Sequence, residues 1–159
     1  MNKRFVYKAS VMLCSCLGLG FSPRGSATIG AFFGGIVFYF FISKYSLVVQ
    51  ICIIAIVFFL GVFGSKIITQ GASNRDPKFI IIDEFAGVCV SFLFVPTNPV
   101  LIIGGIVIFR VFDKFKWLGI SRMENLPHGW GVMLDDLIAG LYSGIVLSLL
   151  SLLHGPFSA

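Results

Sequence analysis

Seven acidic residues occur in this sequence of 159 residues, and five of them form three clusters. Two clusters are the adjacent pairs Asp83-Glu84 and Asp135-Asp136, and Asp113 lies between them in the chain. Carboxylates that converge in an apolar setting repel one another and are costly to desolvate unless a cation lies among them. Because oxygen ligands favour Mg²⁺ or Mn²⁺ over zinc, the three clusters predict a divalent-cation site if the fold brings them together.

Basic residues lie beside the middle cluster. Arg110 and Lys114 are four residues apart, so on a helix they share a face that Asp113 flanks. Guanidinium and ammonium groups bind phosphate, a metal polarises it, and a carboxylate can activate water. The combination of acids and bases therefore indicates phosphoryl chemistry.

Each of these elements also has a purely structural interpretation. Asp83-Glu84 can begin a helix and complement its dipole, and Asp135-Asp136 fits the N-cap of a following helix. Asp76-Pro77 is more typical of an N-cap followed by a proline at the first helical position than of a metal ligand. Arg110 and Lys114 can serve only as anchors at a membrane interface. The convergence of three clusters on one surface would favour the functional interpretation.

The composition indicates a membrane protein. Apolar residues make up 57% of the chain and charged residues only 12%, with a mean hydropathy of +0.99. A soluble chain of this size cannot hide so much apolar surface, and the same values exclude a disordered, collagen-like or disulfide-scaffold protein. The continuous apolarity of Ile51–Leu60 also excludes the alternating strands of a barrel. We expect one domain over residues 1–159, an all-α integral membrane helical bundle of about four to five apolar helices plus a short N-terminal helix.

The apolar stretches position the acidic clusters. A partly interfacial N-terminal helix is predicted at Val11–Phe21, a loop at Lys66–Lys78, and the apolar helices at Ala27–Ile42, Tyr45–Ser65, Phe79–Val95, Val100–Phe109 and Leu137–Leu153. If the third and fourth of these helices form a hairpin that turns at Pro96–Pro99, all three acidic clusters reach the same membrane face.

Positive charge orients the bundle. The chain carries twelve Lys and Arg residues and a net charge of +5. In the predicted topology only Lys44 lies opposite the acidic face, so the positive-inside rule makes the acidic face cytoplasmic. A basic excess of this kind indicates contact with anionic lipid headgroups rather than with nucleic acid.

Four ordered motifs cover about residues 18 to 145. They are Gly20-Phe21-Ser22-Pro23-x4-Thr28-x-Gly30, Asp76-Pro77-x5-Asp83-Glu84-x2-Gly87, Phe109-Arg110-x-Phe112-Asp113-x2-Lys116, and Gly129-x-Gly131-x-Met133-x-Asp135-Asp136-x2-Ala139-Gly140. In their order and spacing these motifs resemble those of the phosphatidylglycerophosphatase A family. The chain departs from the family at Ser26-Ala27, where Pro-Gly is usual, and no departure removes a charged group.

The resemblance implies Mg²⁺-dependent hydrolysis of phosphatidylglycerophosphate to phosphatidylglycerol and inorganic phosphate. It places a multi-pass enzyme of phospholipid synthesis in the bacterial inner membrane, with its active site on the cytoplasmic side. The implied catalytic residues are Asp83, Glu84, Asp113, Asp135 and Asp136; the implied metal ligands are Asp83, Glu84, Asp113 and Asp136; and the implied phosphate-binding residues are Arg110, Lys116 and Thr28. Helical spacing favours Lys114 as the second cation and the family pattern favours Lys116, and we give the family more weight. Because adjacent helical residues point about 100° apart, we expect each acidic pair to supply one ligand and one supporting residue.

The alternative to a hydrolase is a transporter or a divalent-metal-binding membrane protein without hydrolase activity. A transporter normally carries polar or ionisable groups near the middle of several helices. Tyr45–Ser65 and Val100–Phe109 carry almost none. The signature of CDP-alcohol phosphotransferases, a second class of small Mg²⁺-dependent membrane enzymes, is absent from the sequence.

Overall fold

A computed structural model describes residues 3–70, 77–116, 120, 123, 126–127 and 129–153 of the chain. These residues contain helices and turns and no strand, which confirms the all-α prediction. The α-helices are α1 (Lys3–Cys14), α2 (Ser26–Val37), α3 (Leu47–Thr69), α4 (Ile82–Ser91), α5 (Pro99–Phe115) and α6 (Gly129–Leu153). A 3₁₀ turn at Leu19–Phe21 precedes α2, and a π-helical segment at Phe38–Ile42 extends it.

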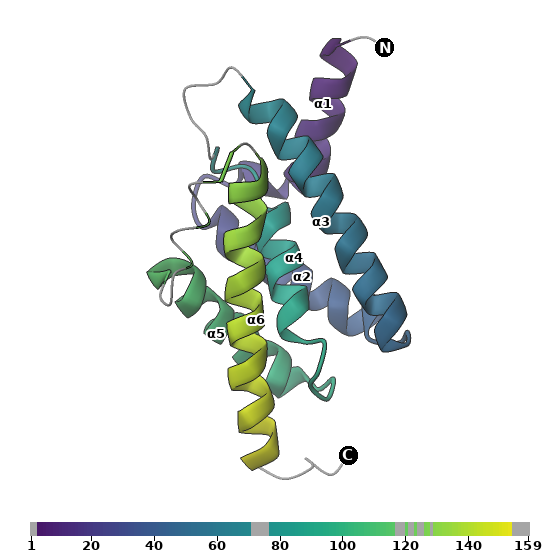
Figure 1. Cartoon of the computed structure of the whole chain (residues 1–159), viewed down its shortest axis with the longest axis vertical. Coiled ribbons are helices and arrows are strands. Elements are labelled where there is room, and N and C mark those ends of the chain that lie inside the picture. Colours follow the sequence, from purple (N-terminus) through teal and green to yellow (C-terminus); the bar gives the residue numbers. More distant parts are fainter. Residues whose placement is uncertain are drawn as a thin grey trace.

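The short helix α4 lies at the centre of the bundle (Figure 1). Helices α2 and α6 pack against it, α5 packs on α6, and α1 lies along the C-terminal half of α3. Residues that come later in α2 and in α6 contact residues that come later in α4, so these three helices run in the same direction. As a result, the beginnings of α2 and α4 and the first turns of α6 gather at one level of the molecule.

Glycines allow this close packing. A Cβ atom on Gly140 of α6 would lie 2.1 Å from the carbonyl oxygen of Gly87 in α4, and one on Gly87 would lie 2.5 Å from the carbonyl oxygen of Asp136. On the other side of α4, a Cβ on Gly34 of α2 would lie 2.9 Å from the carbonyl oxygen of Phe85. Backbones that approach this closely fix the register of α4 against both neighbours.

Two clusters of buried apolar side chains support the bundle. One surrounds Phe38, Phe92 and Phe109, and the other surrounds Phe58 and Met133. Many large apolar side chains nevertheless face outward along α2, α3, α5 and α6. Among the described helices, α3 and α6 are long and apolar enough to cross a membrane, and Ser26–Ile42 forms a shorter apolar helix.

Several predicted boundaries are wrong. The helix predicted at Phe79–Val95 is shorter in the structure, where only α4 is helical. The residues before α4 form hydrogen bonds outside a helix, because the Ile80 N–H donates to the Pro77 carbonyl and the Ile81 N–H donates to the Cys14 carbonyl. The helix predicted at Val100–Phe109 is longer than expected. Its start is capped by the Asn98 side chain, and it continues to Phe115, so Asp113 lies inside it rather than beyond its end.

The largest correction concerns α6, which begins at Gly129 instead of Leu137. Asp135-Asp136 therefore lies in the second turn, and its interpretation as an N-cap is wrong. Helix α3 continues to Thr69 into the predicted loop, and the N-terminal helix is α1 instead of Val11–Phe21. Asp76, predicted as an N-cap, lies outside the described residues.

The contact between α4 and α6 makes a prediction about stability. In Gly140→Ala the new methyl group meets the backbone of α4, so we expect the free energy of unfolding to fall by about 3 kcal/mol. The matched change Gly104→Ala adds a methyl group on α5 with nothing within 4 Å. That variant should be neutral or up to about 1 kcal/mol more stable, because alanine is the better helix former. Thermal unfolding in detergent compares the two, and equal stability of both variants would contradict the contact.

Candidate active site

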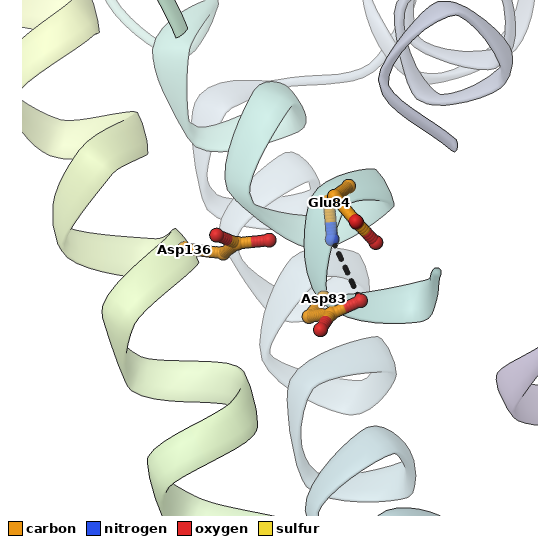
Figure 2. A group of neighbouring side chains, drawn as sticks. All are labelled: Asp83, Glu84 and Asp136. Atoms are coloured by element: carbon orange, nitrogen blue, oxygen red, sulfur yellow. Dashed lines mark hydrogen bonds between the residues drawn. The ribbon is translucent and has the colours of Figure 1, made fainter. Parts of the chain in front are cut away.

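Three carboxylates meet where α4 crosses α6. Asp83 and Glu84 belong to the first turn of α4, and Asp136 reaches them from the second turn of α6 (Figure 2). One ligand atom from each residue lies within 4.8 Å of the other two. All three are buried, with exposed fractions of 7% for Asp83, 8% for Glu84 and 4% for Asp136. We refer to these residues as the carboxylate trio.

Local hydrogen bonds and burial define the state of the trio. Asp83 Oδ1 accepts a hydrogen bond from the Glu84 N–H at 3.1 Å, a donor that a helix start leaves without a partner inside the helix. Glu84 Oε2, in contrast, is buried without a hydrogen-bond partner among the described residues. An orphaned carboxylate oxygen of this kind requires an explanation, and a bound cation supplies one.

The trio forms one wall of a cavity of about 260 Å³. Pockets for drug-sized ligands occupy roughly 300–1,000 Å³, so this cavity fits a phosphate-bearing headgroup and not a whole lipid. Its lining residues are Gly25, Ser26, Ala27, Lys78, Ile80, Asp83, Glu84, Asp113, Lys116, Val132, Asp135 and Asp136. All five acids singled out from the sequence therefore converge on one cavity, from α4, α5 and α6.

Two basic side chains pair with the remaining acids. Lys116 ends α5 in a left-handed conformation (φ 47°, ψ 40°), and its Nζ lies 2.7 Å from Asp135 Oδ2. Earlier on the same helix, the Arg110 guanidinium forms an ion pair with Asp113. Lys114 is exposed and does not line the cavity. The structure thus places Lys116, rather than Lys114, beside the acids.

The predicted residues divide into those in the cavity and those outside it. Asp113 lines the cavity but is not part of the trio, although the resemblance includes it among the metal ligands. Arg110 contacts Asp113 and does not line the cavity, and Thr28 is exposed and does not line it either. The acidic pairs also differ from each other. Asp136 joins the trio while Asp135 pairs with Lys116, whereas both Asp83 and Glu84 belong to the trio.

For part of the cavity wall no functional role was predicted from the sequence. Gly25, Ser26 and Ala27 form the start of α2, and Lys78 lies in the segment before α4. A signal for the first three was present, since they fall inside the N-terminal motif. Lys78 lies five positions before Asp83, and from the sequence it stands out only as one of the charges that orient the bundle.

The residues present fit a divalent cation such as Mg²⁺. All candidate ligands of the trio are carboxylate oxygens, which is the donor type that Mg²⁺ prefers. Counted as ionised, the five carboxylates of the cavity exceed the charges of Lys78, Lys116 and Arg110 by two. One divalent ion would balance this excess.

Comparisons with known proteins give the family of this chain. Residues 12–151 match the family model described as phosphatidylglycerophosphatase A. The chain belongs to this family. The resemblance drawn from the four motifs is therefore confirmed, and the acidic cavity is the candidate active site of a phosphatidylglycerophosphatase A family member.

Curated relatives extend the match over most of the chain. A Bacteroides thetaiotaomicron protein, provisionally named a phosphatidylinositol-3-phosphatase, is 33% identical over 87% of this chain and 91% of its own length. Phosphatidylglycerophosphatase A of Escherichia coli is 31% identical over 86% of this chain and 80% of its own length. The Haemophilus influenzae protein of the same name is 28% identical over 86% of this chain and 85% of its own length. No solved structure matches the chain.

The electrostatic cost of the trio makes a second prediction. When a chelator keeps the protein free of metal, the free energy of unfolding should be about 1 kcal/mol higher for Asp136→Asn than for the unsubstituted protein. The reason is that the substitution removes one buried charge from a group of like charges. Added Mg²⁺ should stabilise the unsubstituted protein by about 2.7 kcal/mol at a hundredfold excess over its Kd, and the variant by much less. Thermal unfolding with and without Mg²⁺ measures both effects. Equal stabilisation of the two proteins by Mg²⁺ would remove Asp136 from the metal site.

Proposed function

We propose that this protein hydrolyses phosphatidylglycerophosphate to phosphatidylglycerol and inorganic phosphate, with Mg²⁺ as cofactor. The observation that carries the proposal is the carboxylate trio inside a headgroup-sized cavity that Lys116 also lines. Family membership and the names of the Escherichia coli and Haemophilus influenzae relatives support this substrate.

The trio fits the metal. Asp83, Glu84 and Asp136 would hold Mg²⁺, which when bound would polarise the phosphomonoester. The ammonium group of Lys116 neutralises a non-bridging phosphate oxygen, and its ion pair with Asp135 keeps it at the cavity. The resemblance also assigns phosphate binding to Arg110 and Thr28, and both assignments remain predictions.

Asp113 is the proposed general base. It lines the cavity outside the trio, and its ion pair with Arg110 orients the carboxylate as a third group orients a catalytic base. Asp113 accepts a proton from water while the water oxygen bonds to phosphorus and the phosphorus–oxygen ester bond breaks. The leaving oxygen of phosphatidylglycerol then takes the proton from Asp113, which restores the carboxylate.

The bilayer provides the setting for this reaction. Helices α3 and α6 span the membrane, the other apolar helices complete a multi-pass bundle of four to five, and the acyl chains remain in lipid. The basic excess on the acidic side orients the cavity toward the cytoplasm of a bacterial cell, at the inner membrane. Composition, helix length and charge support this topology.

A second candidate substrate is phosphatidylinositol 3-phosphate, because the Bacteroides thetaiotaomicron relative carries that activity in its provisional name. Both substrates are lipid phosphomonoesters, so the same acids and cations serve either one. They differ in the group next to the phosphate, a glycerol in one and a substituted inositol ring in the other. A metal-binding protein without hydrolase activity is the remaining alternative.

Phosphate release from purified protein tests the proposal. We expect release from phosphatidylglycerophosphate that requires Mg²⁺ and exceeds release from phosphatidylinositol 3-phosphate and from phosphatidic acid. Asp83→Asn and Asp136→Asn should abolish turnover, and Asp113→Asn should lower kcat by about 10²–10⁴-fold, as for loss of a general base. Lys114→Met, which changes an exposed lysine outside the cavity, should retain full activity.

Three outcomes would count against this account. Faster hydrolysis of phosphatidylinositol 3-phosphate would transfer the proposal to that substrate. Binding of Mg²⁺ by a folded protein that releases no phosphate from any of the three lipids would favour the metal-binding alternative. Normal turnover by Asp113→Asn would exclude Asp113 as the base.

A further inference from the structure

One wall of the cavity has no part in the chemistry described above. It consists of the first residues of α2, Gly25, Ser26 and Ala27, together with Lys78. This wall contains one ammonium group and no carboxylate, whereas the rest of the cavity contains five acids and one lysine. Within the described cavity, the charge is therefore distributed unevenly, and the α2 wall is its acid-free part.

The beginning of α2 is open to an anion. Gly25 occupies the N-cap position in a left-handed conformation (φ 69°, ψ 30°), and no side chain caps the helix. The first N–H groups of a helix lack acceptors within the helix and carry partial positive charge. A Cβ atom on Gly25 would have nothing within 4 Å, so the approach to this turn is unobstructed.

An independent observation indicates that the same cavity holds a ligand. Glu84 Oε2 is buried without a partner among the described residues, in a side chain that is 8% exposed and lines the cavity. A carboxylate so placed indicates a bound cation. A cation at the trio, together with the lysines of the two walls, would supply positive charges that an anion can contact.

A long-range hydrogen bond fixes Lys78 at this wall. Ser26 Oγ donates to the Lys78 carbonyl oxygen at 2.8 Å, across 52 residues of sequence. The bond ties the segment before α4 to the first turn of α2. It therefore holds the backbone of Lys78 beside the uncapped N–H groups, where its ammonium group can reach the cavity.

We propose that Lys78 and the first turn of α2 form a second phosphate-binding wall, which holds the substrate phosphate from a different side than Lys116. Lys78 binds phosphate oxygens directly, and Ser26 is a positioning residue that holds Lys78 in place. The proposal rests on the proposed function for the identity of the lipid. It adds Lys78 and the first turn of α2, to which the resemblance assigns no role, to the residues that bind the phosphate group.

The kinetic test compares two exposed lysines. Lys78→Met should raise KM for phosphatidylglycerophosphate about tenfold, as expected for loss of one charge-assisted contact, with a smaller change in kcat. Lys114→Met is the matched control because Lys114 is exposed and outside the cavity, and its KM should not change. Lys78→Arg should restore most of the affinity, since it keeps the positive charge. Identical KM values for Lys78→Met and Lys114→Met would overturn the proposal.

The positioning role of Ser26 is tested by phosphate affinity, because a purely structural role would change stability without changing that affinity. Ser26→Ala removes the hydrogen bond to the Lys78 carbonyl, and we expect the Ki of inorganic phosphate as a competitive inhibitor to rise severalfold. Ser26→Thr keeps the hydroxyl group and should restore the Ki. If Ser26→Ala lowers the melting temperature but leaves the Ki unchanged, its role is structural and the positioning role is wrong.

A direct binding measurement separates this proposal from the proposed function. Inorganic phosphate is titrated by calorimetry into the detergent-solubilised protein in the presence of Mg²⁺, with Lys78→Met and Lys114→Met in parallel. Weaker binding by Lys78→Met alone supports the wall even if no lipid is hydrolysed, in which case only the proposed function fails. Equal binding by both variants, in a protein that hydrolyses the lipid, removes the wall and leaves the proposed function intact.

Discussion

The contact between α4 and α6 is the constraint on which the candidate active site depends. Gly87 and Gly140 let the two backbones approach more closely than any side chain would permit, and this register places Asp136 opposite Asp83 and Glu84. The carboxylates repel one another, so they are stable there only because extensive helix packing holds them and because a cation can balance them. Packing energy from the glycine contact thus maintains an electrostatic arrangement that favours metal binding.

The direction of the helices adds to this arrangement. Helices α2 and α4 begin at the cavity, and the beginning of a helix carries partial positive charge that favours anions. The same ends can stabilise carboxylates before a ligand binds and phosphate afterwards. Helix α5, in contrast, ends at the cavity, and the ammonium group of its left-handed C-terminal residue Lys116 pairs with Asp135. Backbone dipoles and two lysines together offset part of the negative charge of the cavity.

The sequence predicted the convergence of the acids because alternating helix directions alone bring distant clusters to one end of a bundle. It did not predict the helix boundaries, which depend on tertiary contacts. Residues before α4 bond to the end of α1, and α6 begins two turns early over a glycine-containing segment that packs on α3. The position of the Lys116 side chain depends on the left-handed conformation of this one residue, which a helical periodicity does not predict. For the choice between Lys114 and Lys116 as the lysine beside the acids, the family pattern was therefore more accurate than helical spacing. The role of Lys78 was missed because its partner Ser26 is 52 residues away.

Locating the bound metal tests the central claim most directly. The purified protein is crystallised with Mn²⁺ in place of Mg²⁺, and the anomalous scattering of manganese locates the ion. The account predicts a peak within about 2.5 Å of oxygen atoms from Asp83, Glu84 and Asp136, inside the cavity that Lys116 and Lys78 also line. An ion bound elsewhere, or an empty trio at saturating Mn²⁺, would contradict it, because three buried carboxylates would then lie together without the cation that explains them.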